Sequence, residues 1–585
     1  MFGLLLAMLL LLPLATHAAD HTVLGDQLLV KNPSTPDKRK ISVKAKEVAS
    51  DDTIVGDPVA NGATLTIRMS SLTADSQVYN LPAGTSPITS KPFWSGSALK
   101  GFSYKDPKGE NGPVASVKLK KTSGGVFQIK VAIAGKLGPV ALVPPNPGVD
   151  GCVLLAFNGG GDSYSVNFAT GAVTNKGATL FKVSKPTQEG TCIAANPNNL
   201  PIDHIVVLMQ ENRSADTYLG QLNSEGQPDY EAEPTTGNPD PTNSLNPPIM
   251  PFHKTTYCEV ADLDHSWNGT HNEVDGGAMD GFTAANVDPA DPTGSRTMGY
   301  YDQTDLPFYY GLFSTFATGD RYFCSLLSQT FPNRLYLLAG TSFGHIRNDV
   351  FISTHDSIFN LLDQYAVTWR IYAAQHPLAY GSLFFQYVNN RAVQHVFPIA
   401  QYYADLAAGT LPDVAFVDPE IMDTPTMEND EHPPANVQVG QKYASDVING
   451  LMSSPEWQSS ALFFTYDEHG GFYDHVVPPA APIPDNIPPI LEPGDVPGAF
   501  DQYGVRVPAV VVSPYAKSHF VSHVVHDHTS ILRFIEYRFG LPSMTNRDAA
   551  ADPMLEFFDF NSPPFVSPPS LPAATIDQAQ LNACP

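Results

Sequence analysis

The fold of this chain is decided by the stretch Ile205-Val206-Val207-Leu208-Met209-Gln210-Glu211-Asn212. Its first five residues are apolar and three of them are β-branched, a pattern typical of a strand that is buried on both faces. Polar residues follow at once, so we expect the strand to end there. Glu211 and Asn212 should then lie directly beyond its carboxyl end.

Similar apolar runs recur further along the chain, with helix-like segments between them. They occupy residues 367–372, 414–417, 461–466 and 507–513. Between two of these runs, residues 439–452 place their apolar side chains on one stripe at helical spacing. Buried strands that alternate with helices predict an α/β fold with a mostly parallel sheet and helices on both of its faces.

Two further predicted strands end in carboxylates. Asp418 follows the run at 414–417, and Asp467 and Glu468 follow the run at 461–466. Ligands of an open parallel sheet bind beyond the carboxyl ends of its strands, so these side chains should meet Glu211 and Asn212 at one edge. Carboxylates that lie close together repel one another unless a cation neutralises them.

The economical arrangement is a divalent metal ion held by Glu211, Asn212, Asp467 and Glu468. Oxygen ligands suit Ca, Mg or Mn, and neighbouring histidines could recruit Zn or Fe instead. The alternative is that each carboxylate caps a helix or faces solvent. Because two strand ends carry acids, the pattern favours the metal.

Thr330 is the candidate nucleophile. It precedes an apolar helical run at 335–339, where an N-cap residue belongs, and Pro332 falls in the first turn. The positive end of a helix attracts anions, and a hydroxyl there could attack phosphorus if a metal activated it. From spacing alone, the simpler interpretation is that Thr330 only caps the helix.

Several of the seventeen histidines lie in polar clusters and could bind metal, donate a proton or pair with a phosphate oxygen. A single histidine is more often a structural residue, so we expect about half of this group at the site. The group consists of His265, His432, His469, His475, His526 and His528.

The first third of the chain has a different pattern of apolar and polar residues. Short runs at 64–68, 116–120 and 127–133 alternate apolar and polar residues, which predicts an all-β sandwich-like domain over residues 20–198. The α/β domain then occupies residues 201–585. Of five cysteines, Cys152 and Cys192 share the β domain, and we expect them to pair if the compartment is oxidising.

Residues 1–18 read as a secretory signal peptide, since a short apolar core is followed by small residues. We therefore expect a secreted or periplasmic protein. The formal net charge of −26 argues against nucleic acid as a partner and against anionic membranes. It allows transient contact with a neutral or zwitterionic membrane surface, and no obligate protein partner is implied.

Five motifs around these residues resemble those of the bacterial phosphoesterase family, which contains phospholipases C and a related acid phosphatase. They lie at 202–214, 264–267, 330–336, 428–434 and 466–476, and a further match lies at 528–534. The resemblance implies an alkaline-phosphatase-like fold. It implies that Thr330 is the nucleophile and joins Glu211, Asn212, Asp467 and Glu468 as a metal ligand. It also places His265 and His432 in the phosphate pocket, and His528 at the site.

The resemblance predicts a secreted, metal-dependent phospholipase C that acts on lipids such as phosphatidylcholine. The alternatives are a broad-specificity acid phosphatase that cleaves small phosphate esters, and a non-catalytic exported binding protein. Residues 215–220 depart from the family pattern by lacking an aromatic residue and a histidine. This departure concerns local packing or substrate fit rather than the metal ligands.

Overall fold

The computed structural model describes residues 20–50, 52–70, 75–140, 142, 144, 150–158, 162–189, 198, 200–232, 235–365, 367–421 and 428–584. The signal peptide predicted at 1–18, and Cys192 of the predicted disulfide, lie outside these residues. The chain divides into two compact units. One holds Met1–Pro197 with Gln364–Ala366, and the other holds Asn198–Asp363 and Val367–Pro585.

The N-terminal unit is built from two sheets, as the alternating runs predict. One sheet has the order β1 (Asp20–Thr22), β11 (Ser163–Asn167), β10 (Asp150–Phe157), β4 (Ala63–Ser70) and β5 (Asp75–Leu81). The other has the order β12 (Ala172–Lys176), β13 (Leu180–Ser184), β2 (Gly25–Lys31), β3 (Lys40–Glu47), β9 (Phe127–Ala134), β8 (Val114–Lys121), β7 (Gly101–Lys105) and β6 (Trp94–Ser97). Inward-facing side chains of both sheets, such as Leu65 and Val131, form one hydrophobic core.

The second unit contains the predicted α/β sheet. Its strand order is β19 (Val396–Pro398), β18 (Trp369–Ala373), β20 (Val414–Asp418), β14 (His204–Gln210), β21 (Ser460–Tyr466), β22 (Ala509–Val512), β17 (Ala317–Gly319) and β23 (Val521–Ser522). The first five strands run parallel. β22 is antiparallel to both of its neighbours. The parallel pairing of the first five strands confirms the mostly parallel sheet. All residues of β20 and β21 are buried, which explains their uninterrupted apolar runs.

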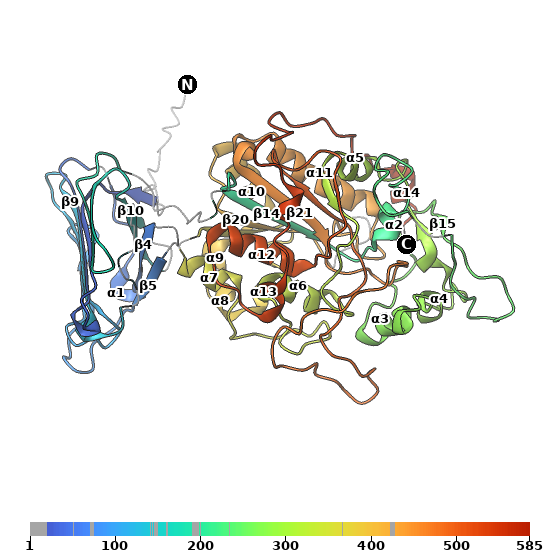
Figure 1. Ribbon diagram of the computed structural model, residues 1–585, viewed down its shortest axis with the longest axis horizontal. Helices are drawn as coiled ribbons and strands as arrows, with labels where there is room; N and C mark the ends of the chain where they lie inside the picture. The colour runs from blue at the N-terminus through green and yellow to red at the C-terminus, as the bar shows by residue number, and fades with distance from the viewer. Residues whose placement is uncertain are drawn as a thin grey trace, which may run out of the picture. The chain divides into compact units, whose positions relative to one another are not determined.

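Helices lie on both sides of this sheet. Figure 1 draws α5 (Pro307–Thr315), α10 (Ile399–Ala408) and α11 (Val437–Met452) on one side of the central strands, and α6 (Thr330–Ala339), α12 (His528–Phe539) and α13 (Asn546–Ala550) on the other. α11 contains the predicted helix and begins after Asn436, whose side chain caps the amide of Gln438.

Shorter elements complete this unit. They are α2 (Ala215–Leu219), α3 (Trp267–Val274), α4 (Phe282–Ala285), α7 (Ile358–Gln364), α8 (Gln386–Asn389), α9 (Ala392–His395), α14 (Gln578–Leu581) and the strand pair β15 (Phe252–His253) and β16 (Gly299–Tyr300). A disulfide joins Cys258 to Cys584. Within the part of the chain that the structure describes, every helix is too short or too polar to cross a membrane.

Candidate active site

The four predicted metal ligands meet where β14 and β21 end side by side. The two strands are paired in parallel, with Gln210 opposite Tyr466, so Glu211 and Asp467 are the next residues on neighbouring strands. The amide of Asn212 donates to Asp467 Oδ1 over 3.2 Å, and the amide of Asp467 donates to the Gln210 carbonyl over 3.1 Å. Asn212 has a left-handed φ of 62°, a conformation that asparagine tolerates better than most residues. The parallel register therefore brings together side chains that are 255 residues apart.

A buried arginine that the sequence did not single out lies among these carboxylates. Arg334 donates to Glu211 Oε1 over 3.0 Å, to Asp467 Oδ2 over 3.4 Å and to the Met209 carbonyl over 3.2 Å. It stands on α6 one turn after Thr330, so one helix supplies both the hydroxyl and this fixed positive charge. The spacing of four residues is the signal that could have revealed it.

Arg334 does not fully offset the cost of burying Glu211 and Asp467 as anions. Burial, only partly opposed by Arg334, raises the pKa of Glu211 to about 7. Burial and the charge of Glu211 raise the pKa of Asp467 well above its usual range. Glu468 differs: burial alone would raise its pKa, but the charges of His265 and His469 lower it overall. Arg334 alone therefore does not keep Glu211 and Asp467 fully ionised, whereas metal ligands must be deprotonated, and a bound cation would favour that form.

The donor set fits a divalent cation. Among the described residues, neither Asn212 Oδ1 nor Glu468 Oε1 has a hydrogen-bond partner, although both atoms are buried. A buried polar oxygen without a partner is costly, and a cation would satisfy it. Glu211, Asn212, Asp467 and Glu468 supply hard oxygen ligands of the kind that Ca, Mg and Mn prefer, and His265 stands close by.

Thr330 is the first residue of α6, and Gln329 rather than Thr330 takes the N-cap position. The side chain of Asn333 fixes the approach to this helix, since it accepts from the amides of Ser325 and Leu326 and donates to the Ser328 carbonyl. Thr330 and Glu211 line one cavity of about 340 Å³. The other lining residues are Phe331, Asn348, Tyr380, Ile421, Glu428, Asp430, His432, Pro433 and Pro434.

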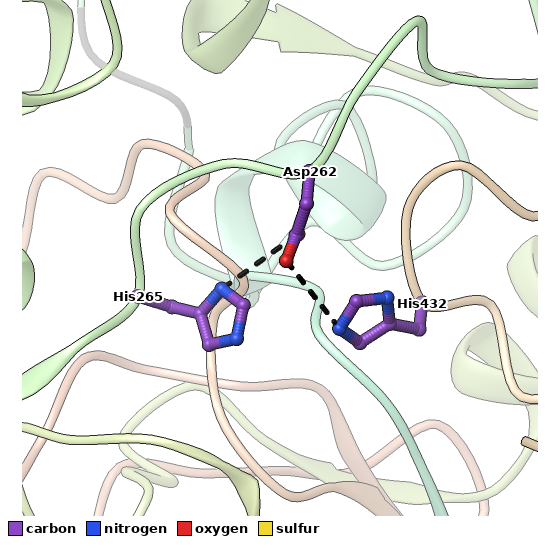
Figure 2. A group of neighbouring side chains, drawn as sticks. All are labelled: Asp262, His265 and His432. Atoms are coloured by element: carbon purple, nitrogen blue, oxygen red, sulfur yellow. Dashed lines mark ion pairs between the residues drawn. The ribbon is translucent and has the colours of Figure 1, made fainter. Parts of the chain in front are cut away.

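His265 and His432 lie close together with Asp262 between them (Figure 2). Asp262 Oδ1 is 3.7 Å from His265 Nδ1, and Asp262 Oδ2 is 3.7 Å from His432 Nε2. The two rings are edge to face with centroids 5.6 Å apart. His265 directly precedes Ser266, whose hydroxyl caps α3, and His432 is on the loop before α11. Asp262 is a site residue that sequence reasoning missed, although it lies only three positions before His265.

Backbone carbonyls fix the protons of both rings. His265 Nδ1 lies 2.8 Å from the Leu263 carbonyl and His432 Nδ1 lies 2.6 Å from the Pro433 carbonyl, so in each ring Nδ1 carries the proton. His265 Nε2 faces Asn212 Nδ2 at 3.4 Å and Glu468 Oε1 at 3.9 Å. Burial alone would lower the pKa of His265, but the negative charges of Glu468 and Asp262 raise it to about 9.

The structure places the ring of His528 against the backbone of Asp467. Its Nε2 is 2.7 Å from the Asp467 carbonyl and its Nδ1 is 3.3 Å from the Tyr322 hydroxyl. Burial lowers the pKa of His528 to about 4, so the ring is neutral at physiological pH. His528 thus supports the backbone of a predicted ligand and does not contribute to the cavity lining described above.

The remaining histidines of the group have carboxylate partners. His469 Nε2 pairs with Glu273 over 2.7 Å, His475 Nδ1 with Asp216 over 2.7 Å, and His526 Nε2 with Glu556 over 2.7 Å. Asp216 belongs to the segment that departs from the family pattern, and it also pairs with Arg506 at 2.9 Å. That segment therefore forms a buried ion-pair network of its own.

Asp430 is a further site residue that the sequence did not indicate. It is fully buried, lines the cavity, and accepts the amide of His432 at Oδ1 over 3.1 Å. Its carbonyl accepts the amide of Glu211 over 2.8 Å, which ties the loop before α11 to the end of β14. Burial and the charge of Glu211 raise the pKa of Asp430 well above its usual range.

Comparisons with known proteins give matches to one family model, to characterised relatives and to solved structures. The sequence model of the phosphoesterase family matches residues 202–542, a range that includes every predicted site residue. Phospholipase C B of Mycobacterium tuberculosis is 34% identical over 477 residues, covering 72% of this chain and 88% of that protein. Non-specific phospholipase C6 of Arabidopsis thaliana is 33% identical over 385 residues, covering 60% of this chain and 71% of that protein. Among solved structures, a protein of the alkaline phosphatase superfamily from Vibrio parahaemolyticus matches with a TM-score of 0.30 at 10% identity, covering 61% of this chain and 74% of that one.

Proposed function

Because this chain belongs to the phosphoesterase family and is therefore a phosphoric ester hydrolase, we propose that it is a phospholipase C with Thr330 as its nucleophile. The observation that carries the proposal is the cavity that Thr330 shares with Glu211, Asp430 and His432. The phospholipase C names of its relatives support a lipid substrate such as phosphatidylcholine.

In the proposed reaction, Thr330 Oγ attacks the phosphorus of the lipid and the diacylglycerol oxygen leaves. A phosphothreonine forms, and water then cleaves it to release the phosphorylated head group and restore the hydroxyl. The N-terminus of α6 and His265 stabilise negative charge that develops on the phosphoryl oxygens. His432, which lines the cavity, is the nearby histidine that can exchange a proton during the reaction.

Glu211, Asn212, Asp467 and Glu468, together with Thr330, would hold a divalent cation. When bound, such an ion supplies positive charge that favours the ionised hydroxyl and neutralises the phosphate. Arg334 holds Glu211 and Asp467 in place through the bonds described above.

The nucleophile is tested with two variants at one position. Thr330→Ala removes the hydroxyl, and we expect kcat on phosphatidylcholine to fall by about 10³-fold or more while the circular dichroism spectrum is unchanged. Thr330→Ser keeps the hydroxyl and serves as the control, with measurable turnover. An alanine variant within tenfold of wild type would remove Thr330 from this role.

Removal of the cation is a separate test. Dialysis against a chelator should abolish turnover, and adding back Ca, Mg, Mn, Zn or Fe singly should identify the ion that restores it. Full activity in a protein shown by elemental analysis to be metal-free would refute the metal requirement. Comparing phosphatidylcholine with an aryl phosphate monoester separates a phospholipase C from a broad-specificity phosphatase.

We also propose that the protein is exported, on the basis of residues 1–18. The intact mass of protein recovered from the culture medium or periplasm tests this, since cleavage would remove the first 18 residues or so. Protein that stays in the cytoplasm with its N-terminus intact would contradict export.

A further inference from the structure

Glu431 is a buried carboxylate that the proposed mechanism does not use. Its neighbours Asp430 and His432 both line the cavity, whereas Glu431 is fully buried among tyrosine hydroxyls. Tyr218 and Tyr466 donate to its Oε2, the latter over 2.9 Å, and Tyr309 donates to its Oε1.

Two of the groups that hold Glu431 belong to the strands that carry the predicted ligands. Tyr466 is the last residue of β21 and directly precedes Asp467. Gln210 is the last residue of β14 and directly precedes Glu211. Its side-chain nitrogen Nε2 lies 3.4 Å from Glu431 Oε1. The same Nε2 donates to the Asn429 carbonyl over 2.8 Å. One carboxylate therefore links both ligand strands to the loop that enters the cavity.

We propose that Glu431 is a positioning residue: its carboxylate fastens the loop of residues 428–434 to the ends of β14 and β21. This sets where Asp430 and His432 stand relative to Glu211 and Asp467. The inference rests on the proposed function, because it concerns the same site.

Two features of the backbone show that the fold is built around this side chain. Glu431 has a left-handed φ of 76°, which a residue with a Cβ adopts only when its surroundings hold it there. Gly440 on α11 lies against it, and a Cβ at that position would come within 2.0 Å of Glu431 Cγ. Glycine is therefore required opposite Glu431.

Loss of the carboxylate should let the backbone at 431 relax, and both neighbours would move with it. The Asp430 carbonyl accepts the amide of Glu211, and Asp430 Oδ1 accepts the amide of His432, so a rotation at Glu431 disturbs both bonds. A displacement of about 1 Å of a catalytic group can lower a rate by about 100-fold.

The test compares Glu431→Ala and Glu431→Gln with Glu536→Ala, using a soluble aryl phosphodiester with a choline head group. Glu536 is an equally buried carboxylate on α12 that bonds Arg533 and Ser543. For Glu431→Ala we expect kcat to fall about 100-fold and KM to change by less than about threefold. Glu431→Gln keeps the length and one acceptor, so it should recover to within about tenfold of wild type. Glu536→Ala should lower Tm by a comparable amount with kcat unchanged.

Two outcomes would overturn the proposal: Glu431→Ala with near wild-type kcat, or Glu536→Ala with an equal loss of kcat at equal loss of Tm. If Glu431→Ala does not fold, Tyr309→Phe removes a single hydroxyl from the cage and must lower kcat by more than Glu536→Ala does, with the loss of Tm measured in both variants. An unchanged kcat in that variant also overturns it. If the wild type hydrolyses no phosphoester, the proposed function fails, and positioning is judged from calorimetric binding of inorganic phosphate. Equal phosphate affinity of wild type and Glu431→Ala, or of wild type and Tyr309→Phe if the alanine variant does not fold, would then refute it, and weaker binding by the variant would support it.

Discussion

Replacing Arg334 by methionine should destabilise the protein, freed of metal by a chelator, by about 3–5 kcal/mol. The reason is that two buried carboxylates would lose the guanidinium that they share. Arg334 is 3% exposed and donates to Glu211, Asp467 and the Met209 carbonyl. A hydrogen bond to a charged group contributes roughly 1.5–3 kcal/mol, so the two carboxylate bonds alone give about 3–6 kcal/mol. The cost of breaking a buried ion pair and the sum of the two hydrogen bonds therefore give a similar loss of stability.

The measurement is urea unfolding followed by tryptophan fluorescence. Trp267, Trp369 and Trp457 all lie in the α/β unit and report on its transition, whereas Trp94 lies in the N-terminal unit. Arg347→Met is the matched control, since Arg347 pairs with Asp495 but is 30% exposed. An exposed pair contributes only about 0–1 kcal/mol, so this variant should unfold nearly as the wild type does.

Adding a divalent cation should restore more stability to Arg334→Met than to the wild type. The ion would neutralise the carboxylates that lost the arginine, and binding to the folded state raises its stability. If Arg334→Met loses no more stability than Arg347→Met, the electrostatic account of this site is refuted. The same conclusion holds if the cation stabilises both proteins equally.

Two other perturbations have definite expected outcomes. The Cys258–Cys584 disulfide spans 326 residues, so Cys584→Ser should lower the unfolding free energy by about 2–4 kcal/mol, and a reductant should then have no further effect through this pair; equal urea midpoints for variant and wild type would contradict this. Burial and the neighbouring Asp548 raise the pKa of Glu536 from 4.5 to about 9, so its contribution to stability is complete below pH 4.5 and is lost as pH rises toward 9. Glu536→Gln cannot titrate, so its stability relative to wild type should rise by about 5 kcal/mol between pH 5 and pH 9 in urea titrations, at ~1.4 kcal/mol for each pH unit between the unfolded and folded pKa values; a pH-independent difference would show that the pKa of Glu536 is not raised.

The central strands could be predicted because a strand that is buried on both faces has an uninterrupted run of apolar residues. β14, β20 and β21 lie within one or two residues of their apolar runs. The short strands β17 and β23 have three and two residues, too few for any periodicity to show. The direction of β22 could not be predicted either, because an apolar run has the same composition whichever way it lies. The segment between β21 and β22 returns without a crossover helix, so the antiparallel direction follows from its path.

The ligands that follow strand ends could be predicted for a topological reason: neighbouring parallel strands bring their carboxyl ends to one edge. Asp262 and Asp430 offered no such signal, since both lie in loops whose path depends on tertiary contacts. Asp430 is in place because its carbonyl binds the amide of Glu211. The Cys258–Cys584 disulfide was equally beyond sequence reasoning, since five cysteines allow many pairings and spacing does not choose among them.

The charges of the site explain why one helix carries both Thr330 and Arg334. The single positive charge of Arg334 cannot balance four acidic side chains, namely Glu211, Asp467, Glu468 and Asp430. The pKa of Glu211 stays raised to about 7 beside it. A second arginine beside it would neutralise more of this charge and weaken the demand for a cation. A neutral residue would leave carboxylates that repel one another even with an ion bound. One buried guanidinium, one turn below the hydroxyl, therefore holds the carboxylates in position while preserving the negative charge that a divalent cation needs.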